Sequence, residues 1–379
     1  MIEEQSVEFE GEETLDCLSE QDGDSISDVY PDALLNISRE TASVFQMKRK
    51  LEKNPPMLDL TPPFQREFVW KTEQKCELIE SIIMGIPLPA FYVKENENGV
   101  YIVVDGKQRL SALFDFIDGK FKLNRLSILK DRNNLSFDQL SLIEQNKIED
   151  YTLTINVIRA PTSDRVTFDL FDRVNRGGTK INHQEMRNAL YQGTSTHLID
   201  ALAQTDSFLD ATERSISPKR MKDRYLVLRF LAFYLWFKHL SVDLDEDRPL
   251  EYKSNIEDFL GKTMFFLNAK SSNDPLILHL EQKFNDTMLA AAQYIVPLGG
   301  FRLPATGKNK RPINMAFFES FCCLMSALKN LTPDSVAHAY GQLMSDQSYI
   351  GTLTYSIDSR SQIQARYDFL KQYLSENDA

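Results

Sequence analysis

The sequence predicts an α+β protein, in which a small α/β domain is followed by a mostly α-helical domain. Strand-like and helix-like patterns alternate over residues 40–192, and helical patterns dominate over residues 193–379. A chain of 379 residues with 42% hydrophobic residues is long enough to form two cores. We therefore expect two folded domains, and we find no internal repeat.

The acidity of the chain is concentrated at its start. The net charge is -12, and residues 1–32 hold twelve of the 55 acidic residues but no Lys or Arg. The remaining 43 acidic residues balance the 43 basic ones. This composition predicts a disordered acidic tail over residues 1–35. Two interpretations of the tail stay open: a solvating extension, or a nucleic-acid mimic that guards a basic groove.

The apolar and cysteine patterns predict a cytoplasmic protein with no membrane partner. The longest apolar run, residues 225–237, is too short to span a bilayer and contains Arg229, so it predicts a buried helix. The N-terminus lacks the basic region and apolar run of a signal peptide. The four cysteines are scattered, which is typical of reduced thiols.

The first domain begins with a helix and a hairpin. Apolar residues recur at helical spacing from Thr72 to Gly85, and these two residues are suited to cap the helix at its start and end. Two apolar strands, 90–93 and 101–104, flank Asn98-Gly99, which favours a hairpin turn. The later patterns predict a helix from about 107 to Gly119 and a helix opened by a Ser136–Gln139 capping box. A strand is expected at 153–158, followed by a helix at 164–175 that ends at Gly177-Gly178. The last helix of the domain is opened by Asn182 and Glu185.

The stretch YIVVDGKQRL runs from a buried strand into a charged turn. The first amides of the following helix carry partial positive charge and suit a phosphate, which Gly106 allows to approach closely. Side chains in a first turn lean back, so we expect Lys107, Gln108 and Arg109 to point toward the same anion. Asp105 is a candidate Mg²⁺ ligand. On these residues alone, a plain junction with solvated charges explains the stretch equally well.

Two further polar motifs suggest a larger site. Gln65, Arg66 and Trp70 follow two prolines; such an Arg can bind an anion and such a Trp can stack on a base. A surface Arg and a core Trp would also explain them. Asn175 and Arg176 precede two glycines and have no evident structural task.

Taken together, these motifs resemble a known family. The sequence resembles the N-terminal domain of GmrSD-type restriction enzymes, a ParB/sulfiredoxin-like domain. The boxes of that family stand here as Gln65, Arg66 and Trp70; Gly85, Pro87 and Pro89; Asp105, Gly106, Gln108 and Arg109; and Phe171, Asn175, Gly177, Gly178 and Glu185. Their order and spacing extend the resemblance over residues 55–192. The stretch RMKDRYLVLRFLAFY resembles, more loosely, the segment after this domain in free-standing members of the family.

The resemblance implies a ParB-like nucleotide-binding fold and a Mg²⁺-dependent nucleoside triphosphate phosphohydrolase of an anti-phage restriction system. It implies that Asp105, Gln108 and Arg109 are catalytic and that Asp105 holds Mg²⁺. The residues expected to bind the nucleotide are Gln65, Arg66, Gly106, Lys107, Asn175 and Arg176. Lys107 departs from the Gln that is usual at this position, which suits phosphate binding better than it supports hydrolysis.

Other features limit this interpretation. The five His residues are far apart, and no His-Asn-His nuclease pattern is present after residue 193, so we expect a separate HNH-type nuclease subunit, or none. No Cys lies in residues 101–110 and no P-loop is present, which excludes sulfiredoxin chemistry and a second nucleotide site of that kind.

Two alternative functions remain. A ParB-like, nucleotide-switched DNA-binding or scaffold protein with little turnover would use a basic loop containing Arg302, Lys308, Lys310 and Arg311. That loop is also explained as a solvated surface, and the balanced charge of the body argues against a broad DNA footprint. A direct nuclease using Asp105 and Glu185 ranks last, because phosphate-loop and capping roles explain both acids better.

Overall fold

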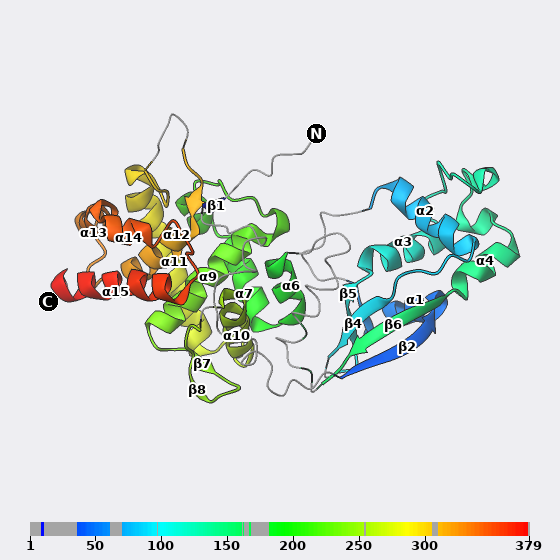
Figure 1. The fold of residues 1–379 in the computed structure, drawn as a ribbon, viewed down its shortest axis with the longest axis horizontal. Helices are drawn as coiled ribbons and strands as arrows, with labels where there is room; N and C mark the ends of the chain where they lie inside the picture. Colours follow the sequence, from blue (N-terminus) through cyan, green and yellow to red (C-terminus); the bar gives the residue numbers. More distant parts are fainter. Residues whose placement is uncertain are drawn as a thin grey trace. The chain divides into compact units, whose positions relative to one another are not determined.

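The computed structural model divides the chain into two compact units, which are coloured by sequence in Figure 1. The sheet unit comprises Asp24–Leu190, and the helical unit comprises Tyr191–Ala379 together with Met1–Gly23. The structure describes residues 9–10, 36–60, 70–96, 98–160, 162, 167, 182–253, 255–304 and 310–377. A mixed sheet in the first unit and a mostly helical second unit confirm the α+β prediction.

A five-stranded mixed sheet forms one layer of the sheet unit. Its order is β2-β6-β4-β5-β3. The strands are β2 (Ile37–Ser43), β3 (Leu58–Asp59), β4 (Phe91–Glu95), β5 (Tyr101–Asp105) and β6 (Thr152–Ile158). β4 runs antiparallel to β5 and parallel to β6, while β3 runs parallel to β5 and β2 antiparallel to β6. The predicted hairpin is therefore confirmed, and Gly99 in its turn has a φ of 73°.

Helices pack on this sheet through one apolar cluster. They are α1 (Val44–Glu52), α2 (Thr72–Ile83), α3 (Lys107–Ile117) and α4 (Leu142–Glu149), and α6 (His183–Leu190) closes the unit. Ile79 of α2, Leu113 of α3, Ile148 of α4 and Val103 of β5 are buried in the same cluster. Burial of such a side chain stabilises the fold by about 1.5–3 kcal/mol. The apolar faces of α2 and α3 therefore hold both helices against the sheet.

Several predicted helix ends are confirmed and two are wrong. Gly85 ends α2 with a φ of 77°, as expected of a left-handed C-terminal glycine. The N-cap of α2 is Lys71 rather than Thr72. Ser136 opens only a 3-10 turn, because Leu140 is extended; α4 starts after a second capping box at Ser141. The helix expected at 164–175 and its glycine end lie, apart from Thr167, outside the described residues.

Glu80 fastens the loop after α3 to α2. Its buried carboxylate accepts hydrogen bonds from the amides of Ile128 at 2.8 Å and Leu129 at 2.7 Å, and from the Ser127 hydroxyl at 3.3 Å. Burial by itself would raise the pKa of Glu80, but these hydrogen bonds outweigh it and leave the pKa below its ordinary value.

Part of the acidic N-terminal segment has a described structure. Phe9–Glu10 forms β1, which pairs in parallel with β9 (Ile313–Asn314) in the helical unit. The rest of the segment predicted as a tail, residues 1–35, lies outside the described residues.

The helical unit packs its helices around α9. The helices are α7 (Thr194–Ala203), α8 (Asp206–Ala211), α9 (Lys222–Phe237), α10 (Ile256–Asn268), α11 (Pro275–Ala290), α12 (Met315–Ala327), α13 (Pro333–Ser345), α14 (Gln347–Gly351) and α15 (Arg360–Asn377), with a small hairpin of β7 (Val242–Asp243) and β8 (Arg248–Pro249). The prediction that the apolar run containing Arg229 forms a buried helix is confirmed. No helix within the described ranges is both long enough and apolar enough to cross a membrane.

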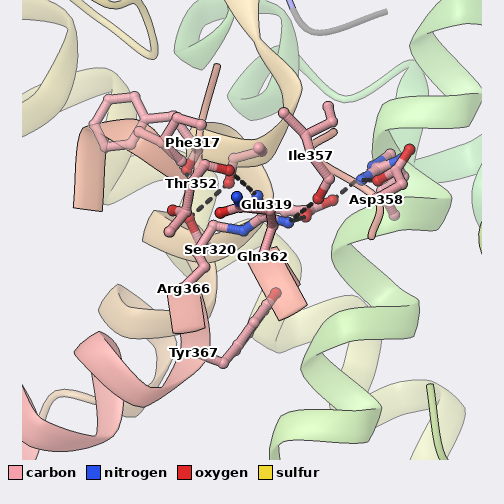
Figure 2. Close-up of polar contacts among 12 residues, drawn as sticks. Phe317, Glu319, Ser320, Thr352, Ile357, Asp358, Gln362, Arg366 and Tyr367 are labelled. Carbon is pink, nitrogen blue, oxygen red and sulfur yellow. Dashed lines mark hydrogen bonds and ion pairs between the residues drawn. The ribbon is translucent and has the colours of Figure 1, made fainter. Parts of the chain in front are cut away.

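A buried charge cluster joins three helices of this unit. Arg229 of α9 donates to Glu319 of α12 and to Asp358, each at 2.6 Å. Arg366 of α15 donates to the other Glu319 oxygen at 3.0 Å and to two backbone carbonyls, and Figure 2 shows Glu319 and Arg366 pointing toward one another. Burial lowers the pKa of Arg229, but the carboxylates of Asp358 and Glu319 outweigh it and hold the pKa above its ordinary value.

We predict that Glu319→Gln lowers the free energy of unfolding by about 3–5 kcal/mol, because it removes the carboxylate shared by two buried guanidinium groups. Urea denaturation followed by circular dichroism measures this loss. Asp368→Asn, which breaks an exposed pair with Lys371 on α15, is the matched control and should change little. Equal losses in the two variants would show that burial of the cluster is unimportant.

We predict that Glu80→Gln lowers the free energy of unfolding at pH 7 by about 1–3 kcal/mol, because a Gln amide cannot replace both accepted bonds. The pKa of Glu80 is lowered in the fold, so its contribution is fully present above the ordinary Glu pKa of about 4.3 and is lost as pH falls through the lower folded pKa. Urea titrations between pH 7 and pH 3 should therefore show the difference from wild type shrinking. Glu77→Gln, an exposed change on the same helix, should show no such pH dependence.

Candidate functional site

The strand β5 passes into α3 through Asp105 and Gly106. The four residues before Asp105 are buried, whereas the Asp105 side chain is 33% exposed. Gly106 is the N-cap of α3 and has a left-handed φ of 97°. A Cβ at Gly106 would lie 2.2 Å from Cδ1 of Phe91. Only glycine satisfies both the backbone angle and the close approach of β4.

The first turn of α3 carries no side-chain cap. The first intrahelical bond runs from the Leu110 amide to the Gly106 carbonyl at 2.9 Å. The amides of Lys107, Gln108 and Arg109 precede this bond, and such amides have no carbonyl partner within a helix. They add the partial positive charge of a helix start to the positive charge of Lys107.

Arg109 folds back onto the segment that leads into β4. Its Nη2 donates to Asp105 Oδ2 at 2.8 Å and to the Ala90 carbonyl at 3.3 Å, and its Nη1 donates to the Pro89 carbonyl. The guanidinium carbon lies 4.3 Å from the centre of the Phe91 ring. The side chain is only 12% exposed. This burial lowers the pKa of Arg109, and Asp105 opposes the shift.

Gln108 connects α3 to the start of α2. Its Oε1 accepts a hydrogen bond from the Trp70 amide at 3.3 Å. The Trp70 side chain is partly buried and packs against the core of the sheet unit. Lys107 is the first residue of α3 and is partly exposed, as Gln108 and Arg109 are.

The structure therefore places five of the predicted site residues, Asp105, Gly106, Lys107, Gln108 and Arg109, in one strand-to-helix junction. The predicted residues Gln65, Arg66, Asn175 and Arg176 lie outside the described residues, as do Phe171, Gly177 and Gly178 of the family boxes. Glu185 accepts from the Asn182 amide at 2.7 Å, and the Glu185 amide donates to Asn182 Oδ1 at 2.8 Å. The predicted capping role of Glu185 is confirmed.

Comparison with known protein families identifies the domain that contains this junction. Residues 43–192 match the family model of the GmrSD restriction endonuclease, N-terminal domain. The resemblance inferred from the motif boxes is thereby confirmed. The GmrSD match covers less than half of the 379-residue chain and leaves the helical unit unassigned. A search of curated proteins found no match.

The GmrSD-matching domain contains site neighbours that sequence reasoning missed. Phe91 and the carbonyls of Pro89 and Ala90 surround the Arg109 guanidinium. Pro89 belongs to a recognised box, but no sequence pattern shows where a backbone carbonyl points. The hairpin pairing of β4 with β5 was a usable signal for Phe91, because it places the start of β4 beside the end of β5.

Two other predicted features have a partial structural description. Within the described parts of the chain, no three His, Cys, Asp or Glu side chains are grouped so as to hold a metal ion. In the basic loop, Lys310 contacts Glu213 at 2.6 Å and Arg302 pairs with the same carboxylate. Arg302 is only 9% exposed, and Lys308 lies outside the described residues. A carboxylate of the same unit thus already neutralises part of this loop.

We predict that Gly106→Ala destabilises the domain by about 2–4 kcal/mol, since a left-handed alanine costs about 1 kcal/mol and overpacking against Phe91 adds about 1–3 kcal/mol. Gly119→Ala is a close control, because Gly119 also has positive φ, 70°, but a Cβ there meets nothing within 4 Å. Urea denaturation of both variants separates the backbone cost from the Phe91 contact. Similar losses of unfolding free energy in the two variants would mean that the Phe91 side chain moves aside at little cost.

Proposed function

We propose that the GmrSD-matching domain binds a nucleoside triphosphate at the start of α3 and hydrolyses it with Mg²⁺ in a DNA-restriction, anti-phage system. The observation that carries this proposal is the α3 start itself: a helix without a side-chain cap that begins after the left-handed Gly106, with Asp105 directly before this glycine and Lys107 directly after it. This arrangement suits an anion that needs both close backbone approach and a cation.

The phosphate groups would lie over the first turn of α3. The amides of this turn would donate to phosphate oxygens, and Lys107 would supply a positive charge. Gln65, Arg66, Asn175 and Arg176 would complete the nucleotide pocket, as the family resemblance implies. The chemistry of triphosphate hydrolysis asks the protein chiefly for positioning and charge neutralisation.

Asp105 is the candidate group for metal and water. A carboxylate at a strand end is a suitable Mg²⁺ ligand, and Mg²⁺ commonly takes only one or two protein carboxylates together with phosphates and water. Bound there, Mg²⁺ would neutralise the charge that develops on the phosphates. Asp105, Gln108 and Arg109 form the candidate catalytic set. Within this set, the Arg109 guanidinium contacts the Asp105 carboxylate.

The domain would act as the nucleotide-dependent part of a larger system. The matched family is described as a restriction endonuclease domain, which supports a role in DNA restriction. We assign DNA cutting to a separate HNH-type nuclease subunit. DNA recognition would follow nucleotide binding. The DNA-binding scaffold alternative gains no support from the basic loop, since Glu213 pairs with both Arg302 and Lys310.

The proposal is tested by incubating the purified chain with each of the four NTPs and MgCl₂. We expect phosphate release with at least one NTP, together with a rise in Tm of a few degrees at about 100 times Kd. Lys107→Gln should raise Kd by about tenfold or more, because it removes a charge-assisted phosphate contact. Asp105→Asn should abolish phosphate release.

Lys120→Gln serves as the matched lysine control. Lys120 follows α3 at its opposite end, where it pairs with Asp115 and Asp118. It should leave both Kd and phosphate release unchanged. The proposal fails if wild-type protein releases no phosphate and no NTP changes its Tm.

A further inference from the structure

We propose that Arg109 is a positioning residue that orients Asp105, and that it does not bind phosphate itself. The Pro89 and Ala90 carbonyls and the Phe91 ring form a socket that holds the guanidinium in place. This inference rests on the proposed function of the junction, and it assigns separate roles to the two cations of the DGKQR stretch: Lys107 binds the anion and Arg109 holds the acid.

The guanidinium of Arg109 is engaged on several sides. It has five N–H donors in one plane, and the described bonds use both terminal nitrogens. One face of the plane rests on the Phe91 ring. To reach a phosphate, the group would have to leave two carbonyls, a carboxylate and an aromatic face. Leaving them would break all of these contacts at once, including the hydrogen bond to the part-buried Ala90 carbonyl.

The socket is itself rigid. The segment between α2 and β4 contains Pro87 and Pro89, which restrict the backbone to extended conformations. The Tyr151 hydroxyl donates to the Ile86 carbonyl at 2.8 Å and accepts from the Leu88 amide at 2.9 Å. The acceptor carbonyls of the next two residues are thus fixed before any ligand binds. The segment that contains Pro87 and Pro89 thus supplies the fixed carbonyls that accept hydrogen bonds from Arg109 of the DGKQR stretch.

Arg109 holds one carboxylate oxygen of Asp105, and the other oxygen is the one that would bind the metal ion or the water molecule. The bond from Nη2 to Oδ2 sets the rotation of the carboxylate. A carboxylate has two oxygens with about four acceptor directions, so a Mg²⁺ ion or a water molecule can take the second oxygen. Losing the guanidinium would leave Asp105 in place but free to rotate, which harms a geometry-dependent step more than it harms nucleotide binding.

The test combines kinetics with a stability cycle. The variants are Arg109→Lys, Arg109→Gln, Asp105→Asn and the double variant Arg109→Gln/Asp105→Asn. Arg109→Lys keeps the charge but lacks the planar fork, so we expect kcat to fall about tenfold or more while Kd for the NTP changes by less than about threefold. Because Asp105→Asn alone should abolish phosphate release, the double variant is measured only in the stability cycle.

The melting temperatures report the socket independently of turnover. Arg109→Gln should lower Tm by about 5 °C, since Asp105 and the carbonyls lose their partner. Adding Asp105→Asn should recover part of that loss, as coupled neighbours do. Arg125→Gln is the matched control: it breaks an exposed pair with Glu73 in the same unit and should leave Tm and turnover unchanged.

The outcomes are distinguishable. Arg109 is a phosphate ligand, and the inference is overturned, if Arg109→Lys or Arg109→Gln raises Kd as much as Lys107→Gln does. Additive losses of Tm in the double variant also overturn it. If wild-type protein binds no NTP, the proposed function alone fails, and the stability cycle still decides whether Arg109 and Asp105 act as a coupled pair.

Discussion

The contact between the Arg109 guanidinium and the Asp105 carboxylate is the interaction on which the candidate site depends. It ties the first turn of α3 to the end of β5 and, through the Pro89 and Ala90 carbonyls, to the segment that leads into β4. Gly106 makes the contact possible, because any Cβ there would collide with Phe91. The start of α3, the Asp105 carboxylate and the Phe91 ring are therefore held together as one unit.

The pairing of a poorly exposed guanidinium with a carboxylate recurs in the helical unit. Arg229 and Arg366 share Glu319 in the core of the helical unit, and Arg302 shares Glu213 with Lys310 near its surface. The fully buried pairs of Glu319 are costly to break but contribute little net stability, so their main effect is on geometry. The helical unit thus uses its arginines to fix how helices and loops meet.

The sequence predicted local features well where a short stretch contained all the interacting groups. The β4–β5 hairpin, the left-handed end of α2 at Gly85 and the Asn182–Glu185 cap needed only neighbouring residues. It misplaced the start of α4, because two capping boxes five residues apart compete and only the extended Leu140 decides between them. The register of the hairpin also shifts between Tyr92 and Val93, which a simple count of residues from the turn does not reveal.

The sequence by itself determined the α+β class, the match of residues 43–192 to the GmrSD N-terminal domain and the order of groups in the DGKQR stretch, because periodicity and motif spacing are one-dimensional properties. Only the tertiary structure decided what those groups contact. Lys107 and Arg109 look alike as cations in the sequence, and only the fold shows that Arg109 contacts carbonyls from a segment about twenty residues away. Backbone carbonyls and ring faces carry no sequence signature, so their directions are set by packing alone.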